Sequence, residues 1–186
     1  MEKLIIKSKR LFIRNLKPID LRDFYEYRSN PEVSKYQGFD TMKKQEAKRF
    51  IDEQTDKFYG VPGEWVQYGI VNKKTGKLVG DCAIKLDDDD DRIAQIGITI
   101  NPIFQNLGIA KEAMIAIMSW LFAVKKMHRI SEIVDIENYN SIKLLEALGF
   151  KREGHFVENV FFNDKWGSEY QYAMLDREWD ETVYKN

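Results

Sequence analysis

The residues whose types and spacing could do the most specific chemistry form the stretch Gln105-Asn106-Leu107-Gly108-Ile109-Ala110. It follows a strand-like run that stops at Asn101-Pro102, and it opens a long apolar segment with helical spacing. Backbone N–H groups at a helix start have no partner inside the helix, and the positive end of the helix dipole lies behind them. The stretch therefore predicts an anion site suited to a pyrophosphate.

Two small residues in this stretch support that interpretation. Gly108 would let the backbone approach a phosphate closely, because it has no side chain to intervene. Ala110 keeps the following turn uncluttered. The alternative is that Gly108 is only a turn glycine in front of a buried helix.

A second polar segment runs from Asn138 through Ser141 and ends in Leu148-Gly149-Phe150. Its apolar residues have helical spacing, and the glycine marks the end of the helix. Asn138 and Ser141 are three residues apart and so lie on neighbouring faces of the helix start. Asparagine is also a good helix N-cap, so a purely capping role is the alternative for Asn138.

These two segments resemble the GNAT superfamily of N-acetyltransferases. Gln105-x-x-Gly108-x-Ala110 is similar to its Gln/Arg-x-x-Gly-x-Gly/Ala pyrophosphate loop, and the second segment is similar to its Asn-x-x-Ser/Ala helix that ends in Leu-Gly-Phe. Within the superfamily the chain resembles the group that contains the ribosomal-protein N-terminal acetyltransferases. The marks of that group are Ser8-x-Arg10-Leu11-x-Ile13-Arg14, Asn30-Pro31-Glu32-Val33 and Tyr172-x-x-Leu175.

The resemblance implies acetyl-coenzyme A as co-substrate. No metal is expected, because His128 and His155 lie far apart in the sequence and Cys82 has no neighbouring ligand type. The resemblance assigns the backbone of Ile98, Thr99 and Ile100 to the pantetheine arm, which would lie where this strand splays from the next one. It assigns residues 105–110 to the pyrophosphate, and the Asn138 amide to the sulfur end of the cofactor.

The sequence departs from the family at two catalytic positions. Many members place a glutamate on the strand before the loop, but no carboxylate occurs between Arg92 and Asn101, where Gln95 stands instead. Many also carry a tyrosine as acid at the position of Leu145. Ser141 then becomes the leading candidate for hydrogen-bonding the departing sulfur, with capping as an equal alternative. Orientation of two bound reactants alone is worth roughly 7–11 kcal/mol in favourable cases.

The elements that must position these residues follow from periodicity and turn residues. Their order predicts an α/β fold with a mixed, mostly antiparallel sheet flanked by helices, and the resemblance adds a sheet splayed at the acetyl-CoA site. Strands are expected at 4–16, 65–71, 78–86, 93–100 and 129–136, with a final hairpin over 150–175 around Asn163-Asp164. Helices are expected at 18–27, 43–58, 109–124 and 139–148.

Length and composition narrow the class of protein. The 186 residues suit a single N-acetyltransferase domain over 1–186, and the net charge of -1 gives no reason to expect a nucleic-acid or membrane partner. No signal peptide is recognisable, and one cysteine, Cys82, suits a reducing compartment, so we expect a cytoplasmic protein. We expect it to be a monomer or a homodimer. Five consecutive aspartates at 87–91 are expected to form a solvated turn.

The sequence therefore predicts an N-acetyltransferase. It would transfer acetyl from acetyl-CoA to a primary amine, on a protein N-terminus or a small molecule, by direct attack in a ternary complex. The alternative is a catalytically weak GNAT-fold module that binds or senses acyl-CoA, because the usual glutamate and tyrosine are absent.

Overall fold

The computed structural model describes residues 3–36, 40–162, 164–180 and 182. In them one eight-stranded sheet has the strand order β1-β2-β3-β4-β5-β6-β8-β7, with all neighbours antiparallel except β5 and β6. The strands are β1 (Ile5–Lys7), β2 (Leu11–Asn15), β3 (Val66–Asn72), β4 (Leu78–Leu86), β5 (Ile93–Ile100), β6 (Arg129–Asp135), β7 (Lys151–Phe162) and β8 (Lys165–Leu175). The helices are α1 (Leu21–Arg28), α2 (Pro31–Ser34), α3 (Lys44–Thr55), α4 (Ile109–Ser119) and α5 (Tyr139–Ala147).

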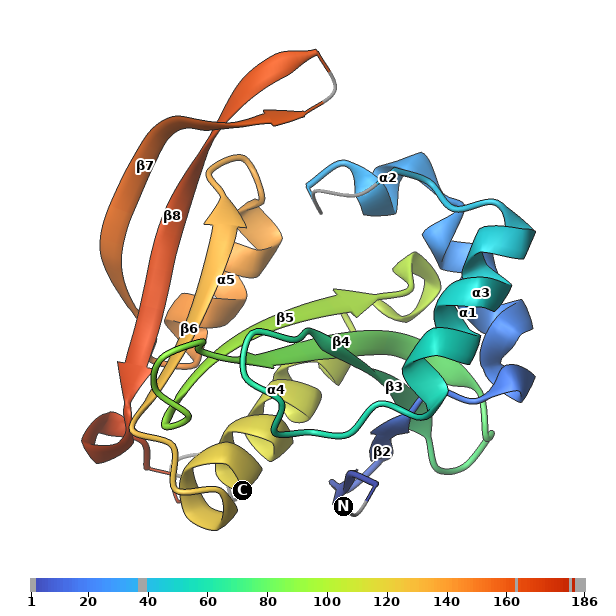
Figure 1. Ribbon diagram of the computed structural model, residues 1–186, viewed down its shortest axis with the longest axis horizontal. Coiled ribbons are helices and arrows are strands. Elements are labelled where there is room, and N and C mark those ends of the chain that lie inside the picture. The colour runs from blue at the N-terminus through green and yellow to red at the C-terminus, as the bar shows by residue number, and fades with distance from the viewer. Residues whose placement is uncertain (1–2, 37–39, 163, 181, 183–186) are drawn as a thin grey trace.

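Helices cover both faces of the sheet (Figure 1). On one face Met114 of α4 and Leu145 of α5 belong to the same buried cluster as Ile130 of β6. On the other face Phe24 of α1 and Ile51 of α3 form a second, smaller cluster. Alternate residues of a strand point to opposite faces, so each β5 and β6 side chain can be assigned to one helical layer.

The parallel contact between β5 and β6 is short. It ends at the pair Gln95↔Ser131, although β5 continues to Ile100 and β6 to Asp135. Beyond that pair the described residues 96–100 and 132–135 form no register with each other, and the two arrows diverge in Figure 1. We call these two segments, 96–100 and 132–135, the fork; the first still pairs with β4 and the second with β8. The predicted α/β class, the mostly antiparallel sheet and its splay are confirmed.

Several expected elements differ in detail. The strand predicted over 4–16 is two strands, because the chain turns back at Ser8, whose N–H donates to the Leu11 carbonyl. The short helix α2 was not predicted; it starts at Pro31, and the Asn30 side chain accepts from the Glu32 N–H at 3.0 Å. The helix expected over 109–124 is α-helical only to Ser119 and ends in a π-helical turn.

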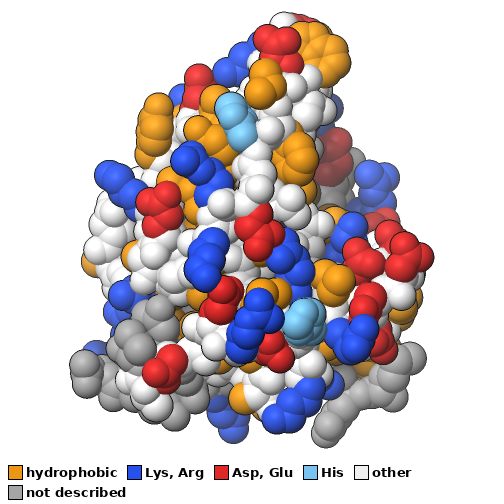
Figure 2. All heavy atoms as spheres, turned by 90° about the vertical axis from the view of Figure 1, so that its left-hand side faces the viewer, with side chains coloured by type: hydrophobic (Ala, Val, Ile, Leu, Met, Phe, Trp, Pro, Cys, Tyr) orange, Lys and Arg blue, Asp and Glu red, His pale blue; other side chains and the backbone are white. Residues whose placement is uncertain are grey.

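The hairpin of β7 and β8 extends beyond the rest of the sheet (Figure 1). Its outer part exposes aromatic side chains, among them Phe161 and Trp166, whose ring centroids lie 5.3 Å apart. Figure 2 shows hydrophobic side chains gathered on the upper part of this side of the molecule. Asp164 of the expected turn has a φ of 58°, while Asn163 lies outside the described residues.

Candidate active site

The loop between β5 and α4 is shaped by a side-chain hydrogen bond and two residues with left-handed backbones. A short 3-10 turn, Pro102–Phe104, follows β5, and the Gln105 side-chain amide donates to the Ile100 carbonyl at 3.0 Å. Asn106 and Gly108 both have left-handed backbones, with φ of 59° and 72°. Gly108 is the N-cap of α4 and has no side chain to cap the helix. The predicted helix start near Gly108 is therefore confirmed.

This loop leaves backbone donors unpaired. Within the described chain, the N–H groups of Asn106, Leu107 and Gly108 have no hydrogen-bond acceptor. They are followed by the first turn of α4, whose N–H groups also lack helical partners. Orphan donors at the positive end of a helix dipole fit an anion, so the residues present fit the pyrophosphate of acetyl-CoA.

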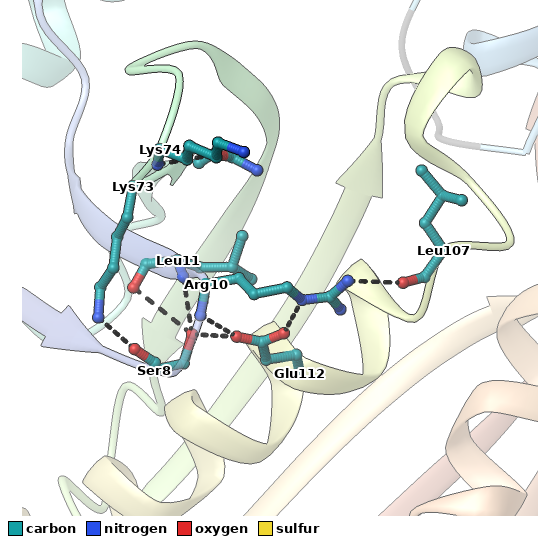
Figure 3. Close-up of polar contacts among 8 residues, drawn as sticks. Ser8, Arg10, Leu11, Lys73, Lys74, Leu107 and Glu112 are labelled. Atoms are coloured by element: carbon teal, nitrogen blue, oxygen red, sulfur yellow. Dashed lines mark hydrogen bonds and ion pairs between the residues drawn. The ribbon is translucent and has the colours of Figure 1, made fainter.

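Arg10 is a residue of this site that sequence reasoning noted only as a family mark (Figure 3). Its guanidinium donates to the Leu107 carbonyl at 3.0 Å and forms an ion pair with Glu112 of α4. A Cβ added at Gly108 would lie 3.6 Å from the same guanidinium, at Nη2. The loop is thus tied to the β1–β2 turn, and a positive charge stands beside the unpaired N–H groups.

Glu112 holds Arg10 in this position. One of its carboxylate oxygens accepts from the Arg10 backbone N–H at 2.6 Å and from the Ser8 hydroxyl at 2.7 Å. Partial burial opposes ionisation, but these hydrogen bonds and the guanidinium outweigh it and lower the pKa of Glu112. Glu112 is therefore an ionised partner, which reduces the net positive charge that Arg10 brings to the loop.

At the fork, one edge of β5 is no longer paired with β6. Ile98, Thr99 and Ile100 pair with β4 on one side, but none of them pairs with β6 on the other. Four residue steps from Ile100 back to Ile96 correspond to about 13 Å of strand. A pantetheine arm lying along this edge would lead from the loop toward the closed end of the fork.

Asn138 and Ser141 meet at the start of α5. The Asn138 side-chain oxygen accepts from the Ser141 N–H at 3.2 Å, which confirms the capping role of Asn138. Its side-chain NH2 group and the half-buried Ser141 hydroxyl have no hydrogen-bond partner among the described residues. Capping therefore leaves donors from both residues available to a ligand.

The positions where family members carry a glutamate and a tyrosine hold no acid or base. Gln95 is the last β5 residue that pairs with β6, and Leu145 is fully buried. The first acidic residue of β6 after its pairing with β5 ends is Glu132, which the sequence analysis did not single out. It follows Ser131 directly and is only 6% exposed. The sequence did contain an indication of this residue: Glu132 alternates with Ile130 and Val134, so it had to lie on the apolar face of the strand.

Cys82 and the aspartate run have the environments expected from the sequence. Burial raises the pKa of the Cys82 thiol well above its usual range, which agrees with a core thiol. The aspartate run forms a turn in which Asp87 accepts from two backbone N–H groups, while the guanidinium of Arg92 lowers the pKa of Asp90 to about 2. In the described ranges no three His, Cys, Asp or Glu side chains gather to hold a metal, and no helix is long and apolar enough to cross a membrane.

Known proteins match both the sequence and the fold. The family model of the acetyltransferase (GNAT) domain matches residues 10–151. An uncharacterized N-acetyltransferase of Bacillus subtilis (strain 168), YnaD, is 30% identical over 94% of this chain and 99% of its own length. The crystal structure of a GNAT-family acetyltransferase from Bacillus anthracis is 27% identical with a TM-score of 0.85, covering 94% of this chain and all of that one.

A third similar protein was solved as a complex with ligands. This is the crystal structure of spermidine N-acetyltransferase from Vibrio cholerae in complex with CoA and spermine. It has a TM-score of 0.76 at 21% identity and covers 92% of this chain and 98% of that one. Since the family model and the relatives cover most of the chain, and the loop and fork suit the same co-substrate, the chain belongs to the GNAT family and is an acetyl-CoA-dependent N-acetyltransferase.

Proposed function

We propose that this enzyme transfers acetyl from acetyl-CoA to a primary amine by direct attack in a ternary complex. The observation that carries the proposal is the continuity of the site. The unpaired loop donors at residues 106–108 follow the end of β5, whose edge at the fork has no register with β6. One extended ligand can therefore occupy both, with its reactive end between two strands.

Each site residue has a task in this proposal. The loop of residues 105–110 surrounds the pyrophosphate and binds it through N–H groups such as those of 106–108, assisted by Arg10, whereas the Gln105 N–H already donates to the Pro102 carbonyl. The backbone of residues 98–100 orients the pantetheine arm. The Asn138 amide holds the sulfur end, and the Ser141 hydroxyl donates a hydrogen bond to the departing sulfur. Holding two reactants in a fixed geometry supplies much of the rate, and the amine loses its proton to water.

The acceptor is a protein N-terminus or a small-molecule amine. Relatives named for amine substrates support this class; the Vibrio cholerae spermidine N-acetyltransferase acts on a polyamine by its name. The continuous sheet supports one catalytic domain over 1–186, and the single buried thiol suits the cytoplasm. We propose a monomer or a homodimer.

Thiol release from acetyl-CoA, measured with a panel of primary amines, tests the proposal. We expect release that depends on both acetyl-CoA and one class of amine. Gln95 and Leu145, in place of the family's glutamate and tyrosine, favour a second candidate, a module that binds or senses acyl-CoA. Tight acetyl-CoA binding with no amine-dependent release would establish that second function and contradict ours.

Replacing Ser141 by alanine is expected to lower kcat by about 10-fold or more while leaving acetyl-CoA affinity within about threefold, because a bond to the leaving sulfur exists mainly in the transition state. The measurement is steady-state kinetics beside calorimetric binding. Ser141→Thr is the matched control, since it keeps the hydroxyl. Equal kcat for Ser141→Ala and the parent would leave Ser141 with a structural role only.

A further inference from the structure

Glu132 is a buried carboxyl with an unsatisfied oxygen. Its Oε2 has no hydrogen-bond partner among the described residues, a property shared there only with Asn15 Oδ1 and Tyr68 Oη. The other two groups are an amide and a weakly acidic phenol, whereas Glu132 is a carboxylic acid. An unpartnered buried carboxyl is costly to the fold, so it calls for a reason beyond packing.

The place of Glu132 in the fork supplies such a reason. β5 and β6 separate after Gln95↔Ser131, and Glu132 is the next residue of β6, at the closed end of the fork. Strand alternation places it on the same face as Ile130 and Val134, whose cluster includes Leu145 of α5. Glu132 therefore lies on the α4 and α5 side of the sheet, where the family's tyrosine position is occupied by leucine.

The groups around Glu132 do not neutralise it. Its cross-strand neighbour on β8 is Tyr172, and the Tyr172 hydroxyl donates to Glu146 of α5 at 2.9 Å. No cation contributes to its titration; burial alone raises the pKa of Glu132 to about 8. The carboxyl is thus largely protonated at neutral pH and has a proton to give.

We propose that Glu132 is the catalytic acid of this enzyme, donating its proton to the coenzyme A sulfur as that sulfur departs. The proposal rests on the proposed function and assigns to a β6 carboxyl the role that a tyrosine of α5 has in many relatives. Ser141 then orients the sulfur from the helix start, and Glu132 supplies the proton.

The amine nitrogen forms a bond to the acetyl carbon while the carbon–sulfur bond breaks, and the electron pair of that bond goes to sulfur. Glu132 gives the proton from its carboxyl to the sulfur and becomes a carboxylate. The proton lost by the amine goes to water, and the carboxylate takes a proton back from solvent after the thiol leaves. No oxidant or reductant is needed.

Contact with the sulfur can be tested by binding, without turnover. Coenzyme A and desulfo-coenzyme A, which lacks the sulfur, would be titrated into the parent and Glu132→Gln by calorimetry. We expect the ratio of the two affinities to change by at least about threefold in Glu132→Gln, as for groups in direct contact. Glu146→Gln is the matched control, because it removes a nearby exposed carboxyl, and it should keep the parent's ratio.

The chemical step gives the second readout. Single-turnover acetyl transfer should fall by about 100-fold or more in Glu132→Gln, since a positioned acid contributes roughly 10²–10⁴-fold, and in Glu146→Gln it should not change. Glu132→Leu replaces the buried polar group by an apolar one and also lacks the proton. This variant should fold and should transfer acetyl as slowly as Glu132→Gln. An unchanged affinity ratio overturns the proposal even where the rate falls, because Glu132 would then act without touching the sulfur. Failure of the parent itself to release thiol would overturn the proposed function as well.

Discussion

Replacing Glu132 by leucine is expected to stabilise the protein by about 3 kcal/mol more at pH 8 than at pH 5. Burial raises the pKa of Glu132 to about 8, from an ordinary value of 4.5. Between these values the folded parent holds a proton that the unfolded chain has lost. The stabilisation from this protonated group is fully present below pH 4.5 and is lost as the pH rises toward 8.

The leucine variant has no such group, so its stability should not fall in the same way. Chemical denaturation of the parent and Glu132→Leu from pH 5 to pH 8 measures the difference, and the subtraction cancels the other titrating groups. Glu132→Gln is the control for charge. It should lose the same pH dependence as Glu132→Leu, but its free energy of unfolding should rise less, since its buried amide still lacks partners. Parallel stability curves for parent and leucine variant would mean that Glu132 titrates normally.

Replacing Gly108 by valine is expected to weaken acetyl-CoA binding by about 100-fold or more and so to abolish the thermal shift. In the parent, ligand at 100 times its Kd should stabilise the fold by about 2.7 kcal/mol, or roughly 5–10 °C in Tm for a domain of this length. A branched side chain at φ 72° forces the loop backbone to change and covers its N–H groups. The measurement is Tm with and without acetyl-CoA.

The same backbone angle makes this variant less stable even without ligand. Gly76 provides the matched control, because it has a φ of 69°, has open space around its Cβ position, and lies in the β3–β4 turn. Gly76→Val should lower the Tm of the free protein while leaving the shift by acetyl-CoA intact. Equal shifts in Gly108→Val and Gly76→Val would remove the loop from the binding site.

Local patterns were sufficient for the elements that begin and end at strong turn residues. The bounds of β4 and β5 agree with the predicted 78–86 and 93–100, since a glycine turn, the aspartate run and Asn101-Pro102 delimit them. The loop at Gly108 could be predicted because a backbone anion site needs only a short pattern of residues, here Gln105-x-x-Gly108-x-Ala110. The fork was expected only through the family resemblance, because the end of pairing between two strands is a non-local property.

The rest of the site could not be found from local patterns. Arg10 is almost one hundred residues from the loop that it contacts, and nothing near it in the sequence indicates that contact. Glu132 looks like an ordinary polar residue of a strand until its face is known. The π-helical turn after Ser119 and the capped helix at Pro31 depend on a few hydrogen bonds rather than on periodicity.

The short seam between β5 and β6 has a mechanical consequence. Three residue pairs join the block of strands β1–β5 to the block β6–β8, whereas β6 and β8 share seven. Among the described strands only the edge pair β1 and β2 has as short a register, so within the body of the sheet backbone pairing is shortest at the seam beside the site. Regions that admit ligands belong to the less cohesive parts of a fold. In the proposed complex the pantetheine arm lies along this seam and adds contacts between the two blocks, so we expect acetyl-CoA to hold them together more firmly than the short register alone does.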